Sequence, residues 1–232
     1  MKAVVIAGGL GKRLRPLTED RPKCLVEVGG KPIVEWQIEW LRSNGVDTVI
    51  ILAGHHRDKL VEFLGSGARF GVSVAYVVED EPLGTGGAIK NAEKIVGREN
   101  FIAVNGDIIT NIPARDLVKY LEDSAEAVAV VALVPLKSPY GIVEVDRSGV
   151  IRSFREKPVI RDHYINAGVY AMRPEIFQYL PERGDIEKET FPKLASEGRL
   201  FGRVYLDRYW RSIDTVKDVE EASREVRDLM FP

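Results

Sequence analysis

Residues 2–15 read KAVVIAGGLGKRLR, an apolar run of strand type that ends in a glycine-rich loop with basic residues. Pro22 and Lys23 follow a few positions later. Glycine lets backbone N–H groups approach a ligand closely and point at it together, and lysine and arginine add positive charge at the same place. The stretch therefore predicts a strand that leads into a binding loop for a polyphosphate.

Two better-known phosphate-binding loops fit these residues poorly. The dinucleotide-binding turn needs a third glycine where this chain has Leu14, and a continuing helix where it has Pro16. It also needs an acidic residue after the next strand, but that strand ends in Ala53-Gly54. The P-loop needs serine or threonine where this chain has Arg13. The loop therefore belongs to neither class.

Strand and helix patterns alternate in the first half of the chain, which is typical of a parallel sheet with helices on both faces. The predicted strands are residues 2–6, 48–52, 73–78, 101–104 and 127–134. The predicted helices start near Ile33, at 57, after Gly86-Gly87 and at 114. The second half predicts a hairpin over 141–154, a strand at 164–173 and helices at 187–197 and 215–229.

Composition limits the classes of protein that fit. The chain has 232 residues, enough for one sizeable α/β domain, and its net charge of −2 argues against a nucleic-acid partner. No apolar run reaches the roughly 18 residues of a membrane span, so no membrane partner is expected. Cys24 is the single cysteine, which excludes an intrachain disulfide and fits a reducing, cytoplasmic setting.

The basic loop is part of a longer pattern, GGLGKRLRPLT over residues 8–18, followed by Pro22-Lys23. This pattern resembles the signature of the sugar-1-phosphate nucleotidylyltransferases, or NDP-sugar pyrophosphorylases, which is G-G-x-G-[TS]-R-[LM]-x-P-L-T and then P-K. Lys12 stands where that family more often has threonine or serine. The resemblance implies that the chain makes an NDP-sugar and pyrophosphate from a nucleoside triphosphate and a hexose-1-phosphate, with Mg²⁺ as cofactor.

The same resemblance implies a fold and a domain organisation. The fold would be of the nucleotide-diphospho-sugar transferase type, a Rossmann-like three-layer α/β sandwich with a mostly parallel mixed sheet. We expect residues 1–232 to form a single nucleotidylyltransferase domain, without the hexapeptide-repeat β-helix that some members append. The sequence leaves the oligomeric state open, and a homo-oligomer is compatible with it.

The resemblance also assigns roles around the phosphates. Arg13 would hold the β- and γ-phosphates as a bidentate cation, and Lys23 would reach the α-phosphate and the sugar phosphate as a point charge. The full set of nucleotide-binding residues that it implies is Ala7, Gly8, Gly9, Gly11, Lys12, Arg13, Leu83, Gly84, Thr85 and Gly106.

Asp107 is the first predicted metal ligand. It follows the apolar strand 101–104, and open α/β sheets bind ligands beyond the carboxyl ends of their strands. Mg²⁺ prefers one or two carboxylates together with phosphate oxygens and water. An aspartate after a glycine can also serve only a turn, and that alternative stays open here.

The second metal ligand is ambiguous in the sequence. Many members of the family end in W-x-D-x-G-T, whereas residues 210–215 read WRSIDT. Aligned on the tryptophan, Ser212 takes the place of the acid; aligned on Asp-Thr, Asp214 does, as in cytidylyltransferase-like relatives. We assign Asp214, with the alternative that it only caps the helix that starts near Thr215.

Three segments predict the sugar side of the site: Tyr140-Gly141, FREKP at 154–158 and NAGVY at 166–170. By resemblance, Glu156 contacts sugar hydroxyls, Lys157 the sugar phosphate and Asn166 the sugar. A Glu-Lys pair on a strand can also be an ordinary surface ion pair. The predicted sugar-binding residues are Asn105, Gly141, Glu156, Lys157 and Asn166, and the predicted catalytic residues are Arg13, Lys23, Asp107 and Lys157.

The choice of substrates depends on residues 81–85, which read EPLGT and resemble mannose-1-phosphate guanylyltransferases most closely. GTP and mannose-1-phosphate are therefore the leading pair. Thymidylyl, uridylyl or cytidylyl transfer to glucose-1-phosphate or another sugar-1-phosphate is the alternative. A non-catalytic regulatory paralogue that binds nucleotide sugars is the alternative from a different class.

Overall fold

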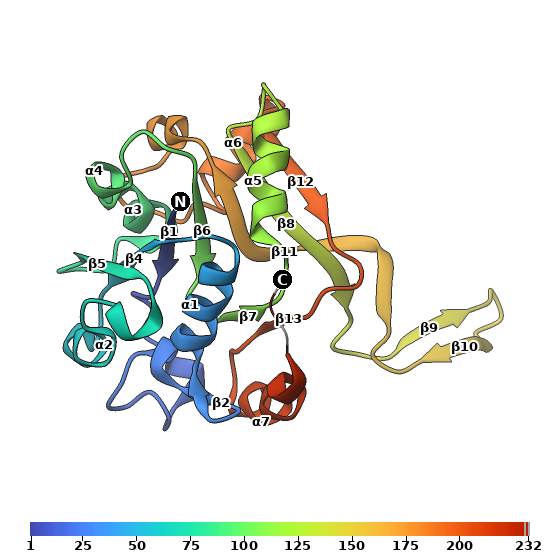
Figure 1. Ribbon diagram of the computed structural model, residues 1–232. Coiled ribbons are helices and arrows are strands. Elements are labelled where there is room, and N and C mark those ends of the chain that lie inside the picture. Colours follow the sequence, from blue (N-terminus) through green and yellow to red (C-terminus); the bar gives the residue numbers. More distant parts are fainter. Residues whose placement is uncertain (230, 232) are drawn as a thin grey trace.

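The computed structural model describes residues 1–229 and 231, and a seven-stranded sheet in the order β12-β8-β11-β6-β1-β4-β5 runs through it (Figure 1). The strands are β1 (Lys2–Ile6), β4 (Thr48–Ala53), β5 (Ser73–Val78), β6 (Phe101–Asn105), β8 (Ala129–Lys137), β11 (Val159–Met172) and β12 (Leu200–Val204). β11 pairs antiparallel with β6 and β8, and the other pairings in this sheet are parallel. The mostly parallel mixed sheet is confirmed.

Helices cover both faces of this sheet, which confirms the three-layer arrangement. One face carries α1 (Ile33–Ser43), α2 (Arg57–Leu64) and α5 (Ala114–Asp123), and the other carries α3 (Gly84–Asn91), α4 (Glu93–Val96) and α6 (Thr190–Ser196). Strand β1 shows why its sequence is apolar from Ala3 to Ile6. Val5 packs into the first helical layer and Val4 into the second, and both are fully buried.

The C-terminal part of the chain returns to the first loop. α7 (Val216–Glu225) packs over a third apolar cluster that includes Leu14, Ile33 and Trp36. A short antiparallel pair, β7 (Ile108–Thr110) with β13 (Trp210–Ser212), fixes the segment before α7 beside the end of β6. The sequence predicted neither of these strands, because three residues are too few to show a period. The predicted helix 215–229 is α7 followed by one 3₁₀ turn, Val226–Asp228.

The predicted hairpin is present and projects from the body as an arm (Figure 1). It consists of β9 (Ile142–Val145) and β10 (Ile151–Arg155), which pair antiparallel. A second short pair, β2 (Glu27–Val28) with β3 (Lys31–Pro32), precedes α1. Within the described residues, no helix is long and apolar enough to cross a membrane. The predicted single domain includes Met230 and Pro232, which lie outside the described residues.

Candidate active site

The glycine loop lies at the carboxyl end of the central strand β1. Gly11 adopts a φ of 59°, in the left-handed region, and its carbonyl accepts a hydrogen bond of 2.8 Å from the Thr18 hydroxyl. A Cβ at Gly11 would lie 3.0 Å from the Thr18 side chain, so glycine suits this position in both backbone angle and space. The loop then turns into a 3₁₀ helix, Lys12–Leu14. Thr18 therefore holds the shape of the loop that was predicted to bind phosphates.

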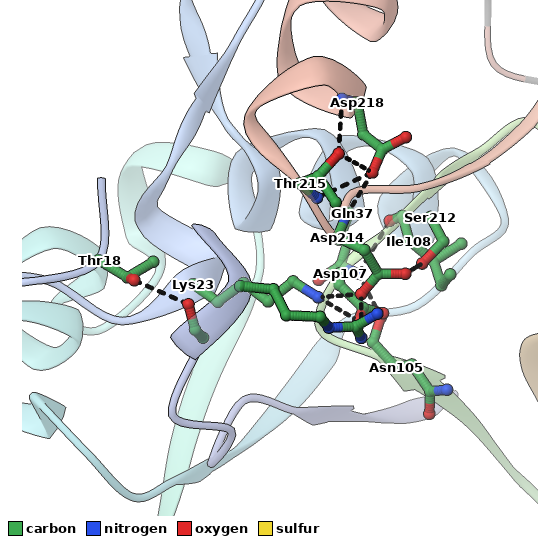
Figure 2. A network of polar contacts seen from close by, with 12 residues as sticks. Thr18, Lys23, Gln37, Asn105, Asp107, Ile108, Ser212, Asp214, Thr215 and Asp218 are labelled. Atoms are coloured by element: carbon green, nitrogen blue, oxygen red, sulfur yellow. Dashed lines mark hydrogen bonds and ion pairs between the residues drawn. The ribbon is translucent and has the colours of Figure 1, made fainter. Parts of the chain in front are cut away.

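Lys23 joins two carboxylates that come from distant parts of the chain. Its Nζ lies 2.6 Å from Asp107 Oδ2 and 2.8 Å from Asp214 Oδ1 (Figure 2). Arg13 also reaches Asp214 Oδ1, at 2.8 Å. The Lys23 side chain is only 16% exposed, so this contact is better shielded from water than a surface ion pair. The structure therefore brings together the two predicted cations and the two predicted metal ligands.

The turn that carries Asp107 is held from two sides. Gln37 on α1 donates from Nε2 to the carbonyls of Asn105, at 2.8 Å, and Ile108, at 3.0 Å. Gly106 donates its N–H to the Ile6 carbonyl at 3.0 Å, and a Cβ at Gly106 would lie 2.5 Å from that oxygen. Only glycine fits this close approach. The position of Asp107 is thus fixed by contacts to the backbone of its turn, as well as by the ion pair between its side chain and Lys23.

The structure removes the alternative that Asp214 only caps a helix. Thr215 is the N-cap of α7 and forms a capping box with Asp218, so Asp214 is not the cap. Ser212 donates to Asp214 Oδ2 at 2.8 Å, which leaves Oδ1 turned toward Lys23 (Figure 2). Burial acts to raise the pKa of Asp214, but the hydrogen bonds from Lys23 and Ser212 and the charges of Lys23 and Arg13 together hold the pKa below its usual range.

These two carboxylates fit a magnesium ion better than they fit a metal that needs a full protein cage. Within residues 1–229 and 231, no group of three or more histidine, cysteine, aspartate or glutamate side chains could hold a metal. Asp107 and Asp214 already converge on one cation, the ammonium of Lys23. Hard oxygen ligands that are few in number match the preference of Mg²⁺ for one or two carboxylates plus substrate phosphates.

A cavity of about 310 Å³ opens beside this cluster. Its lining includes many of the residues predicted for the nucleotide site: Ala7, Gly8, Gly9, Lys23, Gly84, Thr85, Asn105, Gly106 and Asp107. Lys23 and Asp107 stand at the end that adjoins Asp214, whereas Gly84 and Thr85 belong to α3. We call the first the phosphate end of the cavity and the second its base end.

The base end differs in one detail from the sequence prediction. α3 starts at Gly84 rather than after Gly86-Gly87. The N–H groups of Gly86 and Gly87 donate to the Gly184 carbonyl, at 2.9 and 3.2 Å. A Cβ at Gly87 would lie 2.7 Å from the Glu182 carbonyl oxygen. These two glycines therefore let the helix pack closely against the 181–184 segment.

Glu79 is a residue of this end that the sequence motifs missed. It directly follows β5, lines the cavity and is 8% exposed. Burial raises the pKa of its carboxyl group, and the hydrogen bond from the Leu83 N–H opposes that shift only in part. An acid after an apolar strand, two residues before EPLGT, is the signal that could have marked it.

The sugar side is only partly assembled around the cavity. β11 has a bulge that begins after Asn166 and contains Gly168, whose φ is 67°. A Cβ at Gly168 would lie 2.8 Å from Asn105 Nδ2, so the bulge brings the Asn166–Gly168 segment close to Asn105. Asn166 accepts from the Gly168 N–H at 2.8 Å. Gly141, Glu156 and Lys157 instead flank the strands of the arm and do not line the cavity.

A hydrogen-bonded chain connects the sugar side to the base end. Asn166 donates to the Tyr170 hydroxyl at 3.0 Å, and this hydroxyl lies 3.5 Å from Glu187 Oε1. The other oxygen of Glu187 accepts from the Thr85 hydroxyl at 2.6 Å. The predicted base-binding and sugar-binding residues are therefore held in fixed relation through Glu187, which the sequence analysis had not singled out.

Three comparisons with known proteins agree with this geometry. Residues 2–228 match the family model described as nucleotidyl transferase. The chain is 37% identical over 226 residues to a mannose-1-phosphate guanyltransferase of Yarrowia lipolytica, covering 94% of this chain and 62% of that protein. It is 32% identical over 256 residues to a UTP–glucose-1-phosphate uridylyltransferase of Synechocystis, covering 100% of this chain and 66% of that protein. The chain thus spans about two thirds or less of these relatives' lengths.

A solved structure shows the same fold over the whole chain. It is that of a putative glucose-1-phosphate thymidylyltransferase from Bacillus anthracis in complex with a sucrose. The two superpose with a TM-score of 0.80 at 28% sequence identity, and the match covers 100% of this chain and 97% of the other.

Proposed function

This chain belongs to the nucleotidyl transferase family, and we propose that it transfers the nucleotidyl group of a nucleoside triphosphate to a hexose-1-phosphate. An oxygen of the sugar phosphate would attack the α-phosphate, and pyrophosphate would leave. The observation that carries this proposal is the convergence of Lys23, Asp107 and Asp214 at the end of a glycine loop. Such a reaction needs positioning and neutralisation of charge more than covalent chemistry.

Each group at the phosphate end has a role in this proposal. Arg13 would hold the β- and γ-phosphates, where its exposed guanidinium can bind two oxygens at once. Lys23 would turn from the carboxylates to the α-phosphate and the sugar phosphate. The family generally uses a divalent metal, and we assign Mg²⁺ to Asp107 and Asp214. When bound, the metal would add positive charge at the reacting phosphates.

The sugar-binding residues remain proposals of unequal support. Asn105 and Asn166 lie close to one another at the bulge of β11, whereas Gly141, Glu156 and Lys157 lie at the base of the arm. Lys157 has a φ of 44°, a backbone conformation that residues other than glycine adopt at a cost and that clusters at functional positions. We retain it as the group that contacts the sugar phosphate.

For the substrates, we propose GTP and mannose-1-phosphate, which the guanyltransferase relative supports together with EPLGT at 81–85. Glucose-1-phosphate with UTP or dTTP is the second choice, because the other two relatives carry those names. The cytoplasmic location and the homo-oligomer remain predictions from the sequence.

The deciding experiment measures pyrophosphate release with Mg²⁺ while GTP, UTP, dTTP, CTP and ATP are crossed with mannose-, glucose- and N-acetylglucosamine-1-phosphate. We expect one strong pair, with GTP and mannose-1-phosphate leading. Strong release with UTP and none with GTP would replace the donor but keep the reaction. If no pair released pyrophosphate although the chain still bound nucleotide, the result would favour a non-catalytic, regulatory paralogue.

A further inference from the structure

We infer that Arg211 is a positioning residue, which anchors α7 to β13 and thereby fixes Asp214 beside Asp107. This inference rests on the proposed function, because it assumes that the place of Asp214 matters to a bound metal. It names the part of the chain that keeps the second carboxylate in register with the first.

The helix that follows Asp214 gains little from apolar packing. Of the ten residues of α7, all within the described part of the chain, Ala222 alone is buried, and Val219 packs half-buried against the same cluster. A helix that is polar on most of its surface needs other contacts to hold its place. The turn that carries Asp214 connects β13 to this helix, so its position depends on how α7 is anchored.

Arg211 supplies that anchor from the middle of β13. Its Nη2 contacts Glu221 and lies 4.0 Å from Asp218 Oδ1, and its Nη1 lies 3.5 Å from Glu225 Oε1. The three acids follow one another at spacings of three and four residues, so they lie on one face of the helix. The Arg211 side chain is 15% exposed, which shields these ion pairs from water. The forked guanidinium can contact several carboxylates at once, which the single ammonium of a lysine does less well.

Asp218 passes this anchor on to the backbone of the metal-binding turn (Figure 2). While Oδ1 faces Arg211, Oδ2 accepts from the Thr215 N–H and hydroxyl, both at 2.8 Å, and from the Asp214 N–H at 3.2 Å. One carboxylate therefore connects Arg211 to the peptide groups of Asp214 and Thr215.

The same turn is tied on its other side to the first predicted ligand. The N–H of Ile213 donates to the Asp107 carbonyl at 2.9 Å, and the Ile213 side chain is fully buried. A shift of α7 would pull Asp214 away from Asp107, because the turn between Ile213 and α7 is only two residues long. Mg²⁺ demands near-ideal geometry from its ligands, so such a shift should weaken metal binding.

The closing experiment first measures amide hydrogen exchange of the whole chain, without metal or nucleotide. Arg211→Met keeps a long side chain and removes the charge. We expect the amides of Ile213, Asp214 and Thr215 to exchange at least about tenfold faster in this variant, because their acceptors are no longer held in place. The amides of β6 should exchange as before.

The second measurement is the Mg²⁺ concentration for half-maximal pyrophosphate release. Arg211→Met should raise it about three- to tenfold, as expected when the support of a ligand is lost, while KM for the sugar phosphate at saturating Mg²⁺ stays unchanged. Arg211→Lys should restore part of both effects, since it keeps the charge without the fork. The matched control is Arg224→Met, an exposed arginine of the same helix, which should change neither measurement.

Glu221→Gln provides a milder test that does not depend on the folding of Arg211→Met. It removes one acid and keeps the pairs of Arg211 with Asp218 and Glu225, so we expect changes of about two- to threefold in the same direction. Unchanged exchange and magnesium dependence in both variants would overturn the positioning role.

The remaining outcomes separate this inference from the proposed function. A lower melting temperature of Arg211→Met as its sole effect would show a structural role alone and overturn the inference. Faster exchange of the turn with an unchanged magnesium dependence would overturn its link to the metal. Faster exchange in Arg211→Met, together with no pyrophosphate release from the unaltered chain, would keep Arg211 as the anchor of the turn and overturn the reaction.

Discussion

The two ends of the cavity hold carboxylates in opposite surroundings. At the phosphate end, Asp107 and Asp214 share the ammonium of Lys23; at the base end, Glu79 has no cation beside its carboxylate within the described residues. Burial acts to raise the pKa of both Asp214 and Glu79, but it prevails only at Glu79, since Lys23, together with Ser212 and Arg13, reverses it at Asp214. The neighbouring charge, rather than the residue type, decides whether a buried acid suits a metal or a neutral donor.

The largest effect is expected from removing the shared cation. Lys23→Ala should lower turnover by about a thousandfold or more, because a positive charge aimed at the reacting phosphates is lost. The fold should remain, since the side chain lies at the edge of the cavity. Steady-state pyrophosphate release and circular dichroism measure the two effects.

The control for Lys23 is Lys59→Ala, which removes an exposed lysine of α2 away from the cavity lining. It should leave turnover unchanged. Near-normal turnover of Lys23→Ala would contradict the role given to the phosphate end.

The next comparison separates the two residues that competed for the second metal position. Asp214→Asn removes the charge that converges with Asp107, so we expect the Mg²⁺ concentration for half-maximal rate to rise at least about tenfold. Ser212→Ala removes only the 2.8 Å hydrogen bond that orients Asp214, so its effect should be a few-fold. Magnesium titrations of both variants measure this difference. An unchanged magnesium dependence in Asp214→Asn would show that this acid is not a ligand.

A third prediction concerns the support beneath Asp107. Gln37→Leu removes the two donors that hold the carbonyls of Asn105 and Ile108. Leaving these buried carbonyls unpaired should cost about 1–3 kcal/mol of unfolding free energy, and turnover should fall about tenfold as Asp107 shifts. Denaturant unfolding and pyrophosphate release measure these effects. The chain's other glutamine, Gln178, is exposed, and Gln178→Leu should change neither; equal effects would remove the positioning role of Gln37.

The phosphate end was largely predictable from sequence, and the base end was not. The loop with Gly8 and Gly11 is local, and an acid after a central strand marks Asp107, so neighbouring residues were enough to predict both. Gln37 acts through a contact with residues about 70 positions away, and β13 pairs with β7 about 100 positions away, so no local pattern reveals them. Glu79 resembles any polar residue after a strand until its burial is known.

At the arm, by contrast, the sequence motif predicted more than the structure shows. The motif around Glu156 and Lys157 predicted one shared sugar site, but these residues lie outside the lining of the cavity. A motif fixes which residues belong together in a family, whereas their spacing in one conformation depends on how a projecting hairpin is packed. The arm exposes apolar side chains, with Val145 60% and Phe154 65% exposed, and its two strands form a sheet of their own.

The smallest effect tests the unpaired acid itself, through stability rather than binding. Because the pKa of Glu79 is raised in the folded state, the folded chain keeps this proton to a higher pH than the unfolded chain does. The contribution of Glu79 to the free energy of unfolding is therefore most favourable at low pH, and it declines as pH rises through the raised pKa. Glu79→Gln cannot titrate, so its stability relative to the unaltered chain should increase between about pH 4 and pH 7, by no more than about 1 kcal/mol.

Denaturant unfolding of both chains across this pH range, without nucleotide, measures the difference, and its pH dependence does not rely on how well the amide itself packs. Asp80→Asn, which changes the adjacent exposed acid, serves as the control. A flat difference for Glu79→Gln would mean that its carboxylate has partners in solution, and the contrast between the two ends of the cavity would disappear. A rising difference would show that the chain retains at its base end an acid that lowers its own stability at neutral pH, as expected for a group kept for a ligand rather than for the fold.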